Sequence, residues 1–264
     1  MRRSLGQFEG RLLAYTQMRG LRTVRLGELA KPLQLTPTQE RHLLSRMAGV
    51  GLIARVRRGL YLVPPRLPLG GAWSPDEILA LNTLIADRQG SYQICGPNAF
   101  NRYGFDGQVP TRTYAYNNRL SGDRTIGTAA LTLIKVADER LGGTEEATTP
   151  DGLTAIYSSR TRSLVDAVYD WSRFDSLPRA YAWIRRELSG GRVKAAELVD
   201  LAIRFGNQGT IRRIGTLLEQ EGIAEPLLKK LERRLTRSAS LISWIPNRPC
   251  RGKHSKRWGV VLNG

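Results

Sequence analysis

The sequence predicts an α+β fold in two parts, and three observations lead to that prediction. Helical and strand patterns both occur along the 264 residues, and most of the helical ones come late. A stretch rich in proline and glycine covers residues 64–71, which favours a linker between two folded parts. The basic residues gather at the two ends of the chain. We therefore expect a small domain at residues 1–66, a linker at 67–71 and a larger α+β domain at 72–264.

The first part begins with three predicted helices. Apolar residues at helical spacing predict a helix over residues 7–18, and a short second one is expected over 24–29, before Pro32. The third has the strongest start signal, because Thr36 can act as N-cap, Pro37 suits the first helical position and Gln39 completes a capping box. We expect this helix to run to about Val50.

A hairpin is predicted directly after the third helix. Residues 52–63 form two apolar arms, and Arg57, Arg58 and Gly59 lie where the chain must turn. Gly59 can adopt a positive φ at little cost. Three helices followed by a basic hairpin is the element order of a winged helix-turn-helix domain, which we expect here.

The second part mixes strands and helices. We expect a helix over residues 75–87, and the pattern from 163 to about 238 is almost entirely helical. Strand patterns cover residues 111–116, 129–136, 153–157, 241–245 and 258–262. The helices of this domain are thus bunched late in the chain.

The distribution of charge favours a polyanionic partner. The formal net charge is +18, and residues 1–66 hold 13 Lys and Arg against 3 acidic residues. Residues 229–264 hold 10 against 1, whereas the long middle of the chain is nearly neutral. A general solubilising excess would not need this segregation, so double-stranded DNA is the expected partner.

The third helix has one polar face that could read DNA. Hydrogen-bonding side chains lie on that face, while Glu40 points off it. The expected DNA-contacting residues are Thr38, Gln39, Arg41, His42, Ser45 and Arg46 on the helix, with Arg55, Arg57 and Arg58 on the hairpin. The hairpin arginines are expected to meet phosphate rather than bases. An ordinary solvated helix face is the alternative interpretation.

A second basic surface is expected near the C-terminus. A helix over residues 225–237 would place five cations in one stripe: Lys229, Lys230, Arg233, Arg234 and Arg237. Such a stripe would repel itself, which favours a compensating anion such as DNA, RNA or an acidic partner. A stripe screened by solvent and salt is the alternative.

Catalytic, metal and cofactor signals were sought and not found. No acid lies two residues before any lysine, and no Asp-x-Asp, P-loop or Gly-x-Gly-x-x-Gly occurs. Cys250 and His254 lack a second pair at zinc spacing. We expect no enzyme activity, no metal and no cofactor. Two cysteines, no signal peptide and no membrane span suggest a cytoplasmic protein.

Five stretches together resemble one family, the AbiEi-type antitoxins of bacterial abortive-infection loci. Residues 55–64 resemble the "R-x-R-R-G-x-Y" end of the family's winged helix. Residues 97–105 resemble its "S-A-L-x-x-H-G-L" helix and turn, with Tyr103 in place of the usual histidine. Residues 163–166 are similar to "T-L-x-D", residues 209–219 to "R-R-L-G-x-L-L-E", and residues 257–263 to "R-W-x-V-x-V-N". The five stand in the family's order over almost the whole chain.

The resemblance implies a transcriptional autorepressor and antitoxin. Such a protein binds operator DNA with repeated sites and counteracts a nucleotidyltransferase-like toxin encoded beside it in a phage-defence system. The resemblance leaves open whether the two proteins touch. A one-component regulator that senses a ligand in its second domain is the alternative, and a DNA-processing enzyme is the third reading, against which the missing metal-binding acids argue.

Overall fold

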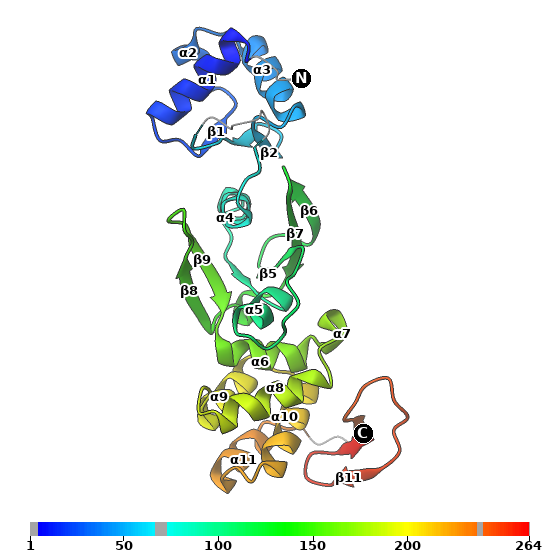
Figure 1. Ribbon diagram of the computed structural model, residues 1–264. Coiled ribbons are helices and arrows are strands. Elements are labelled where there is room, and N and C mark those ends of the chain that lie inside the picture. The colour runs from blue at the N-terminus through cyan, green and yellow to red at the C-terminus, as the bar shows by residue number, and fades with distance from the viewer. Residues whose placement is uncertain (1–4, 67–72, 237–239, 264) are drawn as a thin grey trace.

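The computed structural model describes residues 5–66, 73–236 and 240–263, and its fold is α+β, as predicted. The N-terminal unit, residues 5–66, lies at one end of the molecule (Figure 1). The second unit, residues 73–263, consists of a mixed sheet followed by helices and a small C-terminal sheet (Figure 1). The expected linker at 67–71 lies outside the described residues.

The N-terminal unit packs three helices against a three-stranded antiparallel sheet of order β1-β3-β2. Its elements are α1 (Gln7–Met18), β1 (Thr23–Arg25), α2 (Ala30–Leu33), α3 (Pro37–Gly49), β2 (Ala54–Arg57) and β3 (Leu60–Leu62). Leu12, Leu44 and Met47 belong to its fully buried core. The first and third helices and the hairpin lie where the sequence predicted them.

The predicted helix over residues 24–29 is wrong. Thr23–Arg25 is a strand whose residues pair with Leu60–Leu62, and the short helix follows at Ala30–Leu33. The local preference for a helix is overridden here by pairing with a strand that is distant in the sequence. Val24 is β-branched and therefore suits the strand conformation. Pro32 does not stop the helix but lies in its first turn, where no backbone N–H is needed.

The second unit is centred on a six-stranded mixed sheet of order β6-β7-β5-β4-β9-β8. Its strands are β4 (Tyr92–Ile94), β5 (Thr113–Asn117), β6 (Gly122–Ile126), β7 (Ala129–Lys135), β8 (Thr144–Thr148) and β9 (Thr154–Ser158). Successive residues face opposite sides: Ala115 packs with α4 (Glu77–Asp87), whereas Tyr116 packs with the later helices. The sheet is therefore covered on both faces.

Helices and a small sheet complete the second unit. The helices are α5 (Pro97–Arg102), α6 (Arg160–Tyr169), α7 (Trp171–Phe174), α8 (Arg179–Ser189), α9 (Ala195–Phe205), α10 (Gln208–Gln220) and α11 (Glu225–Glu232), and a 3-10 turn covers Asp138–Arg140. The strands β10 (Ile242–Ser243), β11 (Lys253–Ser255) and β12 (Val260–Leu262) form a sheet of order β10-β12-β11. No helix among the described residues has the length and apolar character that crossing a bilayer requires.

The N-terminal sheet is buried on both faces. Tyr61 and Val63 point into the core of the N-terminal unit, whereas Ala54 and Leu62 belong to the apolar cluster of α4 and the six-stranded sheet. A methyl group added at Gly127, in the turn between β6 and β7, would lie 3.2 Å from the Ala54 Cβ. The two units therefore share a tightly packed apolar contact through this sheet.

Candidate nucleic-acid interface

Helix α3 begins with the capping box that the sequence predicts. The Thr36 hydroxyl accepts a hydrogen bond from the Gln39 backbone N–H at 3.2 Å, and the Gln39 side-chain oxygen accepts one from the Thr36 N–H at 2.8 Å. Pro37 occupies the first helical position. The capping role has a cost for recognition, because the Gln39 amide oxygen, needed for a bidentate contact with adenine, is already engaged.

The outer face of α3 is exposed along its length. All six of its expected DNA-contacting residues are exposed: Thr38, Gln39, Arg41, His42, Ser45 and Arg46. Leu43, Leu44 and Met47 point inward to the core. The Phe8 ring of α1, 40% exposed, lines a shallow hollow of about 260 Å³ together with Gln39 and His42.

Glu40, the acidic residue of α3, is buried in the protein. Its side chain is 1% exposed and accepts backbone N–H hydrogen bonds from Gly27, at 2.9 and 3.0 Å, and from Leu29, at 2.9 Å. The carboxylate thus provides the acceptor for two backbone N–H groups of the loop that connects β1 to α2. As a result, no carboxylate lies on the outer face of α3.

Arg46, at the edge of that face, is tied to α1. Its Nε lies 3.1 Å from Oε1 of Glu9, whose side chain is 5% exposed. The ion pair connects α1 with α3 and engages the Nε of Arg46, although the side chain remains 55% exposed. Among the arginines of the outer face, Arg41 is therefore the better candidate for a base contact.

The β2–β3 hairpin presents two of its three arginines to solvent. Gly59 has a φ of +80° at the turn, as the sequence predicted. Arg55 and Arg58 are exposed. Arg57 instead points to α4, where its Nε and Nη2 each lie 2.6 Å from a carboxylate oxygen of Asp87.

Asp87 also contacts the first strand of the same sheet. Its Oδ1 lies 3.2 Å from Nη1 of Arg25, and its side chain is 5% exposed. The hydrogen bond from Arg57, with the charges of both arginines, lowers the pKa of Asp87 to about 2. Sequence reasoning missed this residue, although an acid at a helix C-terminus opposes the helix dipole and so indicates a cationic partner elsewhere.

The expected C-terminal stripe is present only in part. Helix α11 ends at Glu232 rather than at 237. Beyond it the Thr236 N–H donates to the Gln208 side chain at 3.0 Å instead of to a carbonyl one helical turn back, and Gln208 in turn donates to the Arg234 carbonyl. Four of the five cations are exposed, namely Lys229, Lys230, Arg233 and Arg234. Lys230 forms an ion pair with Asp200, and Arg237 lies outside the described residues.

The last two family-like motifs contact each other. The Gly215 backbone approaches Trp258 so closely that an added Cβ would lie 2.4 Å from the indole, and the Trp258 Nε1–H donates to Glu219 at 3.1 Å. Arg212 donates its Nε–H to the Trp258 carbonyl at 2.6 Å, and Arg213 donates to the Ser243 carbonyl. Both arginines are buried, which makes them packing residues rather than parts of a charged surface.

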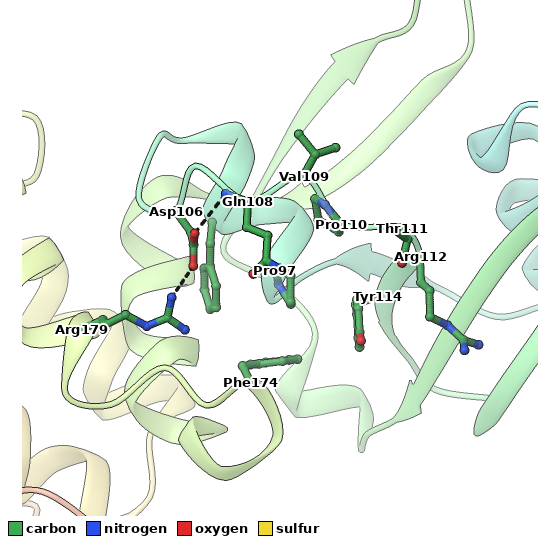
Figure 2. Close-up of a pocket in the computed structure, with 11 residues that line it drawn as sticks. Pro97, Asp106, Gln108, Val109, Pro110, Thr111, Arg112, Tyr114, Phe174 and Arg179 are labelled. Atoms are coloured by element: carbon green, nitrogen blue, oxygen red, sulfur yellow. Dashed lines mark hydrogen bonds and ion pairs between the residues drawn. The ribbon is translucent and has the colours of Figure 1, made fainter.

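A separate cavity of about 220 Å³ lies between α5 and α7 in the second unit. Figure 2 shows the rings of Tyr114 and Phe174 at this cavity and the ion pair of Arg179 with Asp106, at 2.6 Å. Arg112, also on its wall, is paired with Asp123 at 2.9 Å, but its Nε is buried without a partner. Within the described part of the chain, no three His, Cys, Asp or Glu side chains are grouped as metal ligands.

Comparison with known proteins supports the fold. No family model and no curated protein matches the chain. Among solved structures, the chain is similar to the RV2827C protein from Mycobacterium tuberculosis, with a TM-score of 0.60 and 15% sequence identity. The likeness covers 98% of this chain and 92% of that one. At this identity it shows a shared fold that includes both units.

Proposed function

We propose that the protein is a DNA-binding transcriptional autorepressor whose N-terminal unit acts as a winged helix-turn-helix. The observation that carries the proposal is the outer face of α3. It offers hydrogen-bonding and cationic groups to solvent, while Glu40 is turned into the protein. Because the Glu40 carboxylate is engaged by the N–H groups of Gly27 and Leu29, it does not oppose a polyanion at this face. In this proposal the protein acts where the DNA is, in the cytoplasm.

The chemistry divides the contacts into two kinds. Arg41, with two parallel N–H donors, suits guanine in the major groove; His42 lies next to it, and Ser45 lies one turn further along the same face. Arg55 and Arg58 suit phosphate oxygens beside the groove, because a hairpin flanks the duplex and meets mainly the backbone. α3 then supplies sequence preference and the hairpin supplies affinity.

Selection from a pool of random duplexes, followed by fluorescence anisotropy on the enriched sequence, tests this function. The informative variant is Gln39→Glu, since glutamate keeps the capping box but puts a carboxylate on the outer face. We expect a folded protein with DNA binding weakened by at least tenfold. Unchanged binding would place the DNA elsewhere on the molecule, and failure of the parent protein to enrich any duplex would refute DNA reading.

We further propose that the protein is an antitoxin against a nucleotidyltransferase-like toxin. The support is the set of motifs shared with AbiEi-type antitoxins, of which the last two pack together as one structural piece. The exposed cations Lys230, Arg233 and Arg234 offer a surface for an acidic partner or for further DNA. The antitoxin could act by direct contact with the toxin or without touching it.

Growth rescue tests the antitoxin role. The chain is co-expressed with the nucleotidyltransferase-like protein encoded beside it, as the parent and as a variant with Lys230, Arg233 and Arg234 reversed to Glu. Rescue by the parent supports the role, and its absence refutes it. If rescue and DNA binding both survive the triple reversal at physiological salt, the stripe is ordinary surface charge.

A regulator that senses a small ligand is the second candidate function. The cavity of Figure 2 favours it, because two aromatic rings, Tyr114 and Phe174, and the ion-paired Arg179 and Asp106 line it. A thermal-shift screen with small carboxylates and phosphates tests it. Thr111→Trp, which would fill the cavity, should abolish any shift that arises there. A screen without shifts would remove this candidate.

A further inference from the structure

The contact between the two units contains an ion cluster at one end of the N-terminal sheet, where Arg25 and Arg57 both lie opposite Leu60. Asp87 ends α4, and its carboxylate oxygens accept from Arg57 Nε and Nη2 at 2.6 Å and from Arg25 Nη1 at 3.2 Å. The remaining Arg57 nitrogen, Nη1, donates to the Arg58 carbonyl at 2.8 Å. Every nitrogen of the Arg57 guanidinium is therefore engaged within the protein.

The helix itself gives no reason for an acid at this position. Asp76 at the N-terminus of α4 caps the helix by accepting from the N–H groups of Ile78 and Leu79, where a negative charge is favourable. Asp87 lies at the opposite end, where the helix dipole disfavours a carboxylate. The negative charge of Asp87 is stabilised instead by Arg25 and Arg57 of the N-terminal sheet. We therefore assign Asp87 a role toward the N-terminal unit rather than within α4.

Arg25 and Arg57 are two of the cations that a DNA phosphate would otherwise attract. We infer that Asp87 is an intramolecular competitor for phosphate, which keeps Arg57 out of DNA contact, whereas Arg25 stays half-exposed beside it. The phosphate contacts of the hairpin are then left to Arg55 and Arg58. This inference rests on the DNA binding proposed above and adds that the second unit sets its strength. A movement of α4 away from the hairpin would release Arg57.

The test measures binding of the full chain to a fluorescently labelled random-sequence duplex over a series of salt concentrations. The proteins are the parent, Asp87→Asn, Arg57→Gln and the double variant. Asp87→Asn should tighten binding about threefold to tenfold near physiological salt and steepen the log–log salt slope by about 0.9, the value for one added phosphate contact. Arg57→Gln alone should leave the slope unchanged, and the double variant should lose the gain.

Two matched variants control for charge and for the hairpin. Asp151→Asn removes a negative charge from the second unit near the N-terminal unit, since the Asp151 backbone carbonyl accepts from Arg22, but it leaves Arg57 paired. Asp151→Asn should change both the affinity and the salt slope by less than Asp87→Asn does. Arg58→Gln should lower the slope by about 0.9 in both the parent and the Asp87→Asn background.

Three results would overturn the inference. Asp87→Asn could leave affinity and slope unchanged, its gain could survive in the double variant, or Arg57→Gln alone could lower the slope. Failure of the parent to bind the duplex would refute DNA binding itself, which separates the two proposals. Melting curves check that the variants fold, and if Asp87→Asn does not, the Arg57→Gln slope decides alone.

Discussion

Replacing Glu40 by alanine removes the acceptor that holds the loop before α2 against the proposed DNA-reading helix. The carboxylate accepts three short N–H contacts, two from Gly27 and one from Leu29, and its own side chain is 1% exposed. Alanine would leave the Leu29 N–H without this acceptor in a fully buried environment. Gly27 is exposed, so water could replace the lost contact there.

The magnitude follows from these two donors. A buried N–H left unsatisfied costs about 1–3 kcal/mol, and the loss of the charge-assisted bond to Gly27 adds up to about 1 kcal/mol after rehydration. The space vacated by the side chain adds a smaller packing loss. We expect Glu40→Ala to lower the free energy of unfolding by about 3 kcal/mol, a large part of the stability of an ordinary domain. Glu40→Gln keeps one oxygen and should cost about half as much.

Urea unfolding followed by circular dichroism measures the change, and hydrogen exchange with mass spectrometry locates it. Exchange should accelerate most in the α3 amides and in residues 27–29. Glu197→Ala is the matched control, because this glutamate is exposed on α9. A loss for Glu40→Ala below about 1 kcal/mol, or one equal to that of the control, would refute the assigned role of the carboxylate.

Three further outcomes are expected. Arg41→Ala should cost about 1–3 kcal/mol on the selected duplex and much less on random DNA, measured by anisotropy. Gly215→Ala should lower the free energy of unfolding by about 1–3 kcal/mol, because its Cβ would overlap the Trp258 ring. The pKa of Asp87, about 2 in the folded protein, lies below its unfolded value near 3.9, so the folded state binds fewer protons. This contribution to stability is present above about pH 4 and is lost as the pH falls toward 2, as acid titration of the melting temperature should record.

Each of these outcomes has a control. Arg58→Ala should weaken both duplexes equally, and an equal loss for Arg41→Ala would move Arg41 to the backbone-contacting class. Gly10→Ala, at an α1 position with open space around the added Cβ, should be neutral or slightly stabilising. Asp87→Asn should flatten the acid titration over the stated window, and an unchanged profile would contradict the assignment.

Local chemistry explains which features could be predicted from the sequence. Thr36, Pro37 and Gln39 specify the start of α3 within four residues, and Gly59 marks the hairpin turn, so both were predicted correctly. That Glu40 points off the polar face also followed from helical periodicity, whereas its burial against Gly27 and Leu29 did not. The exposed positions of the expected recognition residues follow from the same period of 3.6 residues.

Contacts between distant residues explain the features that were not predicted. Thr23–Arg25 becomes a strand because β3 lies beside it, and beyond the end of α11 the Thr236 N–H donates to the distant Gln208 side chain. The pairing of Arg57 with Asp87 joins residues 30 positions apart. Strands β6 and β8 carry mostly polar residues on exposed sheet edges, so the apolar alternation that identifies a strand is missing.

The burial of the N-terminal sheet on both faces has a consequence for cooperativity. Because Ala54 and Leu62 complete an apolar cluster whose other members belong to the second unit, melting the N-terminal unit would expose apolar surface on its neighbour. The free energy of that exposure links the two unfolding equilibria. The chain should therefore give a single calorimetric transition, and an excised fragment of residues 1–66 should melt at a lower temperature than the same residues in the whole chain.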